Sequence, residues 1–288
     1  MAKTRIPDLQ TRKKEHKKIS MVTAYDYPTA KLADEAGIDI ILVGDSYGMV
    51  QLGYETTTSV TMDEMLTAAK AVSRGAKRAL LVGDMPFMSF HSSIEEAVQN
   101  AGRFVKEGGM DAVKIEGGQF SDVAHAIVRT GIPVMGHVAL SPQTALLWGS
   151  YPVQGKDAAQ ARRILDQSMQ LESAGAFSIV LEMLTAEVAE LITQTLSVPT
   201  IGIGAGPSCD GQVLVLHDIL GLYPNFTPKF AKQYLNLSAE ILRALTSFKA
   251  DIENEHFPTA EHTFHMSPDE QKRLRELIQT GSTPENKV

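Results

Sequence analysis

The sequence predicts a single (β/α)8 barrel, a ring of parallel strands surrounded by helices. Short apolar runs alternate with stretches of helical periodicity along the 288 residues. Each strand–helix unit takes up roughly 30 residues, and the length of the chain matches the usual size of such a barrel, about 250 residues. Five of the runs lead into acidic, basic or histidine side chains, as expected where buried parallel strands meet at one mouth.

Eight apolar runs are the strand candidates. They cover residues 19–24, 40–43, 79–82, 112–115, 134–139, 178–181, 200–203 and 213–216. Amphipathic segments lie between them, and two of these segments open with capping-box sequences at 61–64 and 93–96. We expect helices to stop at Gly37, at the pair Gly108–Gly109 and at Gly175. The repeated order of strand and helix favours a parallel sheet.

Two connections exceed the usual loop length. Residues 47–60 and 141–156 follow the second and fifth strands, so we expect lids or specificity elements, with plain surface excursions as the alternative. Trp148 is either a hinge anchor or a packing residue.

The barrel domain is expected to cover residues 1–264, with 237–250 as its closing helix. A charged tail, 265–288, would follow, helical over 268–277 and disordered from 281.

Composition argues against several classes of partner. The formal net charge of −7 disfavours a nucleic-acid surface, and we interpret the basic cluster 12–14 and 17–18 as a solvated arm. Cys209 is the only cysteine, so no intramolecular disulfide can form. The first residues lack a secretory signal, and no apolar run approaches the ~20 residues of a membrane span. We therefore expect a cytoplasmic protein without membrane contact.

Carboxylates at neighbouring strand ends indicate a metal site. Asp45 and Asp84 follow the second and third strands, and Glu116 follows the fourth. Carboxylates held together repel one another unless they are protonated or bridged by a cation. Hard oxygen donors without a Cys or His cluster favour Mg²⁺ over Zn²⁺. The alternative is that each Asp merely caps the loop that follows it.

Three further residues have chemical potential. Lys114, within a buried strand, needs an acidic partner or an anionic ligand, so it neutralises a neighbouring carboxylate, holds a substrate oxyanion, or does both. A Schiff base is a third possibility. Glu182, at the end of the sixth strand, is a candidate general base away from the metal. His137 is either a donor or base for substrate, or a satisfied core histidine.

Six motifs, taken together, resemble the ketopantoate hydroxymethyltransferase family of the phosphoenolpyruvate/pyruvate barrel superfamily. They are GDS (44–46), VGDMPF (82–87), VKIEGG (113–118), MGHVALSPQ (135–143), LEML (181–184) and IGIGAG (201–206). The resemblance covers about residues 6–262.

The resemblance implies an activity and a role for each site residue. Asp45, Asp84 and Glu116 would hold Mg²⁺. Asp45, Ser46, Asp84 and Lys114 would bind 3-methyl-2-oxobutanoate, and Glu182 would accept its C3 proton. The enolate would then take a hydroxymethyl group from 5,10-methylenetetrahydrofolate, giving 2-dehydropantoate and tetrahydrofolate. The family further implies a homodecamer, a pentamer of dimers.

Two other functions are compatible with a barrel of this kind. A carbon–carbon lyase of the isocitrate-lyase type would share the Mg²⁺ and enolate chemistry, but it would need an acid cysteine in a loop, and Cys209 follows the wrong strand. A non-catalytic binding barrel is disfavoured because idle carboxylates crowded at one mouth repel one another.

Overall fold

The computed structural model describes residues 2–147, 151–223 and 227–281. It divides into two compact units, Met1–Asn236 and Leu237–Val288, which are described separately. Trp148 and the end of the tail, 282–288, lie outside the described residues.

The first unit is a closed barrel of parallel strands, as predicted. Its strands are β1 (Ile19–Thr23), β2 (Ile40–Val43), β3 (Leu80–Asp84), β4 (Ala112–Lys114), β5 (Val134–Ala139), β6 (Ser178–Glu182), β7 (Thr200–Ile203) and β8 (Gly211–Leu214). Each strand pairs in parallel with the next, and β8 pairs with β1 to close the ring.

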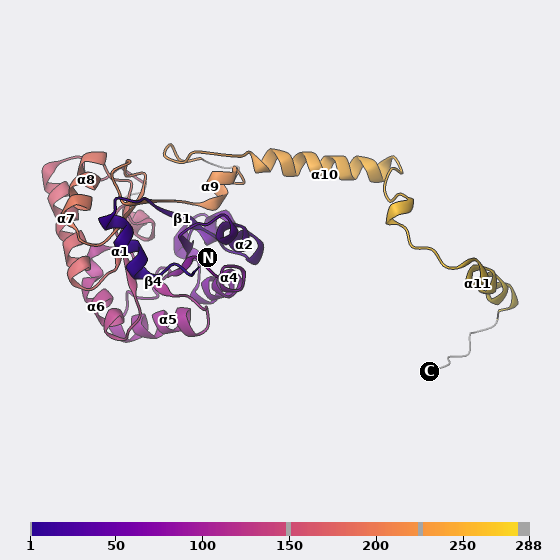
Figure 1. The fold of residues 1–288 in the computed structure, drawn as a ribbon, viewed down its shortest axis with the longest axis horizontal. Coiled ribbons are helices and arrows are strands. Elements are labelled where there is room, and N and C mark those ends of the chain that lie inside the picture. The colour runs from indigo at the N-terminus through magenta and orange to yellow at the C-terminus, as the bar shows by residue number, and fades with distance from the viewer. Residues whose placement is uncertain (1, 148–150, 224–226, 282–288) are drawn as a thin grey trace. The chain divides into compact units, whose positions relative to one another are not determined.

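Helices surround the strands in chain order (Figure 1). The α-helices of this unit are α1 (Ile6–Lys14), α2 (Tyr27–Glu35), α3 (Tyr47–Val50), α4 (Met62–Gly75), α5 (Ile94–Lys106), α6 (Ser121–Arg129), α7 (Ala158–Ser173), α8 (Ala186–Thr195) and α9 (Leu216–Leu220). Short 3-10 turns are η1 (Thr57–Ser59), η2 (Gly118–Phe120) and η3 (Pro142–Leu147). The buried faces of the helices pack on the outside of the barrel and form the larger apolar core.

Local sequence signals explain where the helices begin. In α4 the Thr61 hydroxyl accepts from the Glu64 N–H, and the Glu64 carboxylate accepts from the Thr61 N–H, so the predicted capping box is complete. In α5 the Ser93 hydroxyl accepts from the Glu96 N–H, but the Glu96 carboxylate turns to the Ser92 hydroxyl instead. The second capping box is therefore only half formed.

The last strand is displaced from its predicted position. We expected residues 213–216, whereas β8 ends at Leu214 and Leu216 begins α9. The Leu216 N–H donates to the Thr23 hydroxyl on β1 at 3.1 Å, which turns the chain away from the strand direction. The predicted strand end was wrong because the apolar run 213–216 continues into α9, which begins at Leu216.

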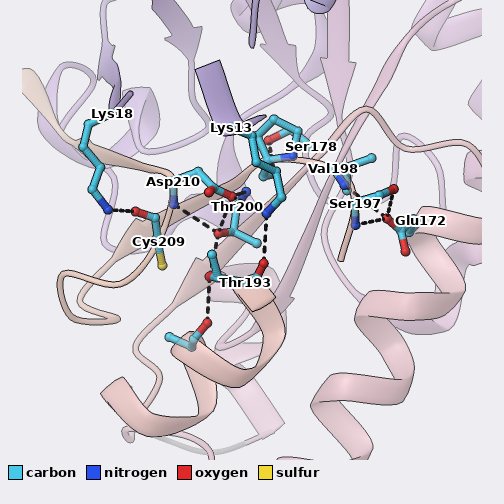
Figure 2. Close-up of polar contacts among 12 residues, drawn as sticks. Lys13, Lys18, Glu172, Ser178, Thr193, Ser197, Val198, Thr200, Cys209 and Asp210 are labelled. Atoms are coloured by element: carbon cyan, nitrogen blue, oxygen red, sulfur yellow. Dashed lines mark hydrogen bonds and ion pairs between the residues drawn. The ribbon is translucent and has the colours of Figure 1, made fainter. Parts of the chain in front are cut away.

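We interpreted the basic cluster 12–14 and 17–18 as a solvated arm, and this is wrong for Arg12 and Lys13, which contact the barrel. Helix α1 places Leu9 in the inner core, fully buried. Lys13 donates to the Asp210 carboxylate at 2.7 Å and to the Thr193 carbonyl at 2.9 Å (Figure 2). Arg12 forms an ion pair with Asp39 at 2.7 Å. Arg12 and Lys13 thus fasten α1 to the barrel through partners far away in the sequence, whereas Lys14 and Lys17 are exposed, as predicted.

The second unit contains α10 (Leu237–Glu253), η4 (Ala260–His262) and α11 (Pro268–Thr280). The tail helix predicted at 268–277 is confirmed as α11, where the Ser267 hydroxyl accepts from the Glu270 N–H. The segment expected to close the barrel corresponds to α10, which has no buried residue and belongs to this second unit. The domain boundary after residue 264 stays a prediction.

Candidate active site

Three buried acidic side chains meet at the carboxyl ends of the strands. Asp84 ends β3, whereas Asp45 and Glu116 each lie two residues beyond the end of β2 and β4. Each side chain offers one carboxylate oxygen, and these oxygens all lie within 4.8 Å of one another. All three residues are at most 4% exposed. The predicted convergence of the carboxylates is therefore confirmed.

Lys114 provides the positive charge of this cluster. Its Nζ lies 2.6 Å from Asp84 Oδ1 and 3.0 Å from Glu116 Oε1. Although burial disfavours an ammonium ion, Asp84 and Glu116 raise the pKa of Lys114 further above its ordinary value. Lys114 is thus a charged partner of the carboxylates, which confirms the neutralising role among its predicted alternatives.

The acidic residues experience unequal electrostatic environments. Burial and the charges of Asp84 and Glu116 raise the pKa of Asp45 well above the ordinary value. The pKa of Glu116 is lowered because Lys114 and His137 outweigh the effect of burial. Lys114 and His137 thus compensate the charge of Glu116, whereas Asp45 has the least compensated charge.

His137 connects this cluster to Glu182. The ring Nδ1 lies 3.2 Å from Glu116 Oε1, and Nε2 lies 3.2 Å from Glu182 Oε2, although neither contact has the angles of a well-aligned hydrogen bond. Burial opposes the charge of the ring, but Glu116 raises the pKa of His137 to about 9. The structure thus favours an ion-paired imidazolium over a neutral core histidine.

Ser46 lies next to Asp45 and is held by a buried tyrosine. The Ser46 Oγ and the Tyr25 hydroxyl are 2.8 Å apart. Burial raises the pKa of Tyr25, so the phenol stays protonated and can donate. Ser46 also lines the cavity beside the carboxylates, as the sequence led us to expect.

Two site residues were missed by the analysis of the sequence. Gln143 Nε2 donates to Asp45 Oδ2 and to the Met85 carbonyl, both at 3.0 Å. The Ser141 hydroxyl donates to Glu116 Oε2 at 2.6 Å. Both residues lie within four residues of the end of β5, where the chain enters the 3-10 turn η3, and the strand pattern does not predict how such a turn is oriented.

A cavity of about 430 Å³ opens above these groups. Its acidic end contains Asp45, Asp84 and Glu116, and its remaining wall is largely apolar, including Val180, Ile203, Val213 and Phe230. Both long connections contribute to the lining, through Met49 and Val50 from the first and through Pro142 and Tyr151 from the second. Both connections therefore border this cavity, and their role as lids or specificity elements stays a prediction.

The side chains fit a magnesium ion. Mg²⁺ prefers oxygen donors and commonly takes one or two carboxylates, leaving its other positions to water and substrate. The buried cluster supplies carboxylate oxygens alone, and Asp45 lacks a cation of its own. Within the described residues, this is the one group of acidic, His or Cys side chains with a spacing suited to a metal.

Fold and site together define a (β/α)8-barrel enzyme whose mouth is built from buried carboxylates and one lysine. A family model described as ketopantoate hydroxymethyltransferase matches residues 3–260. The chain belongs to that family.

Relatives of similar length support this assignment. A protein of Nitrosopumilus maritimus named 3-methyl-2-oxobutanoate hydroxymethyltransferase is 52% identical over 95% of this chain and 98% of its own. Proteins of the same name from Carboxydothermus hydrogenoformans and Moorella thermoacetica are 50% and 53% identical, covering 95% and 90% of this chain and 100% and 97% of theirs.

Solved structures with low sequence identity share the fold. Phosphonopyruvate hydrolase in complex with oxalate and Mg²⁺ aligns with a TM-score of 0.58 at 13% identity, covering 96% of this chain and 98% of that one. The 2,3-dimethylmalate lyase, a member of the PEP mutase/isocitrate lyase superfamily, aligns with a TM-score of 0.53 at 15% identity, covering 96% of both chains. At these identities the likeness concerns the barrel alone.

Among the described residues, none of the helices combines the length and the apolar character that crossing a membrane demands.

Proposed function

We propose that this enzyme transfers a hydroxymethyl group from 5,10-methylenetetrahydrofolate to 3-methyl-2-oxobutanoate, giving 2-dehydropantoate and tetrahydrofolate. The observation that carries the proposal is the joint presence of a buried carboxylate cluster and Glu182 in one cavity. Relatives that are 50% and 52% identical to this chain are named 3-methyl-2-oxobutanoate hydroxymethyltransferase, and the cavity suits this reaction.

Each side chain has a task that follows from its position. Asp45, Asp84 and Glu116 would hold Mg²⁺, which when bound would withdraw electrons from the keto group and make the C3 proton more acidic. Ser46 and Lys114 would orient the 2-oxo acid through its oxygens.

Glu182 would take the C3 proton. It is a carboxylate of this cavity that lies outside the metal cluster, beside His137, with 17% of its side chain exposed. His137, whose Nε2 lies 3.2 Å from Glu182 Oε2, would position this carboxylate and partly neutralise its charge. The C3–H bond breaks and C3 forms a bond to the one-carbon unit, whose bonds to the two folate nitrogens break. Water supplies the new hydroxyl, and the C3 proton and the second water proton end on these nitrogens as tetrahydrofolate leaves.

Location and assembly are further parts of the proposal. The single cysteine supports a reducing compartment, the cytoplasm. The family resemblance supports a homodecamer, and the mass in solution tests it.

Exchange of the C3 hydrogen tests the function. The protein with Mg²⁺ should exchange the C3 hydrogen of 3-methyl-2-oxobutanoate with deuterium from D₂O, and should form 2-dehydropantoate once the folate is added. Absence of exchange with and without folate would refute the transferase proposal. Cleavage of a 2-hydroxy acid instead would identify a lyase.

A further inference from the structure

A second carboxylate lines the same cavity and takes no part in the metal cluster. Asp218 lies in α9, just beyond the end of β8, and is 7% exposed. Within the described residues, its side chain accepts no hydrogen bond and forms no ion pair within 4.0 Å, although its backbone is bonded within α9. A buried carboxylate without a donor is unfavourable, because its lost hydration is not replaced.

The surroundings hold Asp218 firmly at the mouth. One residue earlier, His217 Nε2 lies 3.1 Å from Gln51 Oε1, which ties α9 to the chain just after α3. Two residues earlier, the Leu216 N–H donates to Thr23 Oγ1. Gly221 ends the helix in the left-handed conformation, with φ of 61°. The position of Asp218 is therefore fixed by the contacts of the residues before it and by the end of the helix after it. A preorganised binding group is held in the same way.

The charge of Asp218 has no counterion nearby. Lys114 is engaged with Asp84 and Glu116, and Lys229, which also lines the cavity, lies beyond ion-pair distance of Asp218. Burial raises the pKa of Asp218 to about 6, so the group is ionised at neutral pH yet poorly solvated. Such a carboxylate is suited to a ligand that brings its own N–H donors.

The cavity has room for more than the small oxo acid. The carboxylate cluster marks the place at which the oxo acid would bind, and the wall that contains Asp218 also includes apolar side chains such as Val213, Val215 and Tyr223. An apolar wall with one placed polar group is the usual setting for a flat heterocycle. The pterin ring of a reduced folate is flat, and on one edge it carries a ring N–H beside an amino group.

We propose that Asp218 binds this edge of the pterin, accepting one hydrogen bond from the ring N–H and one from the 2-amino group. A carboxylate can accept two parallel N–H bonds, and their geometry fixes the orientation of the ring. The inference rests on the proposed function and adds to it the residue that selects the one-carbon donor. Asp218 is thus a specificity residue for the co-substrate, and it lines the same cavity as Glu182.

The test compares D218N with E55Q in the full-length protein with Mg²⁺. Glu55 is an exposed acid on the connection after β2 and does not line the cavity, so both variants lose one negative charge at the same end of the barrel. D218N should raise the KM for 5,10-methylenetetrahydrofolate about 10- to 100-fold, because charge-assisted hydrogen bonds are lost. E55Q should leave this KM near the wild-type value, and in D218N the KM for the oxo acid should change much less than the KM for the folate.

A change in the ligand gives a second readout that needs no variant. Wild-type protein should bind tetrahydrofolate about tenfold or more tightly than its analogue with a methyl group in place of the 2-amino group. D218N should lose this discrimination, if it folds with a wild-type unfolding temperature. Equal binding of both ligands by the wild type would overturn the inference, as would an unchanged folate KM in a folded D218N. Failure of the wild type to exchange the C3 hydrogen or to turn over would instead count against the proposed function.

Discussion

The Nε2 atom of His137 lies 3.2 Å from Oε2 of Glu182. The other ring nitrogen, Nδ1, lies 3.2 Å from Oε1 of Glu116, which belongs to the carboxylate cluster. The ring therefore separates the candidate base from the candidate metal ligands by the width of one imidazole. Since the pKa of His137 is raised to about 9, the ring is charged at neutral pH and is poorly suited to accept a proton there. Glu182 is the better candidate for the base.

We expect E182Q to slow C3 hydrogen exchange of the oxo acid by about 10²- to 10⁴-fold, the usual contribution of a general base. The amide keeps the size of the side chain, so Mg²⁺-dependent binding of the oxo acid, measured by calorimetry, should persist. H137Q serves as the comparison and should slow exchange less, because it removes only the support of the base. Survival of full exchange in E182Q, with loss in H137Q, would transfer the role of base to His137.

Lys114 should matter most when no metal is present. Replacing it by methionine leaves Asp84 buried without a cation and leaves Glu116 with His137 alone, and breaking a buried ion pair typically costs about 3–5 kcal/mol. We expect K114M to lose about that much free energy of unfolding in EDTA and to recover part of it with Mg²⁺, measured by urea denaturation. K31M, which removes an exposed lysine of α2, is the control and should change little. A loss that Mg²⁺ does not reduce would argue against metal binding by these carboxylates.

Asp34 should give the protein an acid-dependent stability. Its carboxylate accepts backbone N–H bonds from Lys77, Arg78 and Ala79 at 3.1, 2.8 and 2.7 Å. Although burial works against the charge, these donors lower the pKa of Asp34 below its ordinary value of 3.8. A lowered carboxyl pKa stabilises the fold above the unfolded-state pKa, and this stabilisation is lost as the pH falls through the folded-state pKa.

We therefore expect D34N to reduce the free energy of unfolding by about 2 kcal/mol at pH 7. The difference from the wild type should shrink as the pH is lowered below about 4, where the wild-type carboxyl becomes protonated. Chemical denaturation across this pH range measures it. E35Q, one residue further along α2 at an exposed position, should follow the wild-type curve. A deficit in D34N that is independent of pH would mean that packing, and not charge, is responsible.

Parallel strands explain how much of the site could be predicted. Asp45, Asp84, Lys114 and Glu116 each lie at or just beyond a strand end, and the register of β2, β3 and β4 brings them together whatever the loops do. The strand pattern alone could therefore predict their convergence. The bridging position of His137 was not predictable, because it depends on the orientation of one ring between two side chains from other strands.

Contacts between distant residues account for what the sequence did not reveal. Lys13 and Asp210 are 197 residues apart, so nothing near Lys13 in the sequence indicates this partly buried partner. Gln143 reaches Asp45 from 98 residues away through a 3-10 turn after β5, and amphipathic periodicity does not predict such turns. Contacts that are fixed by strand register could thus be predicted from the sequence. Contacts that depend on tertiary packing, such as those of Lys13 and Gln143, could not.

Gly83 illustrates a packing requirement directly beside a candidate metal ligand. It pairs with Val43 and Val113 in the barrel, and a Cβ added there would lie 2.4 Å from Cδ1 of the fully buried Phe104. We expect G83A to lose about 1–3 kcal/mol of unfolding free energy by overpacking. It should also weaken Mg²⁺-dependent exchange, because the strand must shift next to Asp84.

The same helix that carries Phe104 supplies the control. A Cβ at Gly102 would meet nothing within 4 Å, so G102A should stabilise α5 by about 0.5–1 kcal/mol. The double variant G83A/F104L should recover part of the stability that G83A loses, since the smaller side chain frees space for the methyl group. Thermal and urea unfolding of the set of variants measures this coupling. If the G83A deficit and the F104L deficit simply add, the two residues do not interact through the predicted clash, and Gly83 is required for another reason.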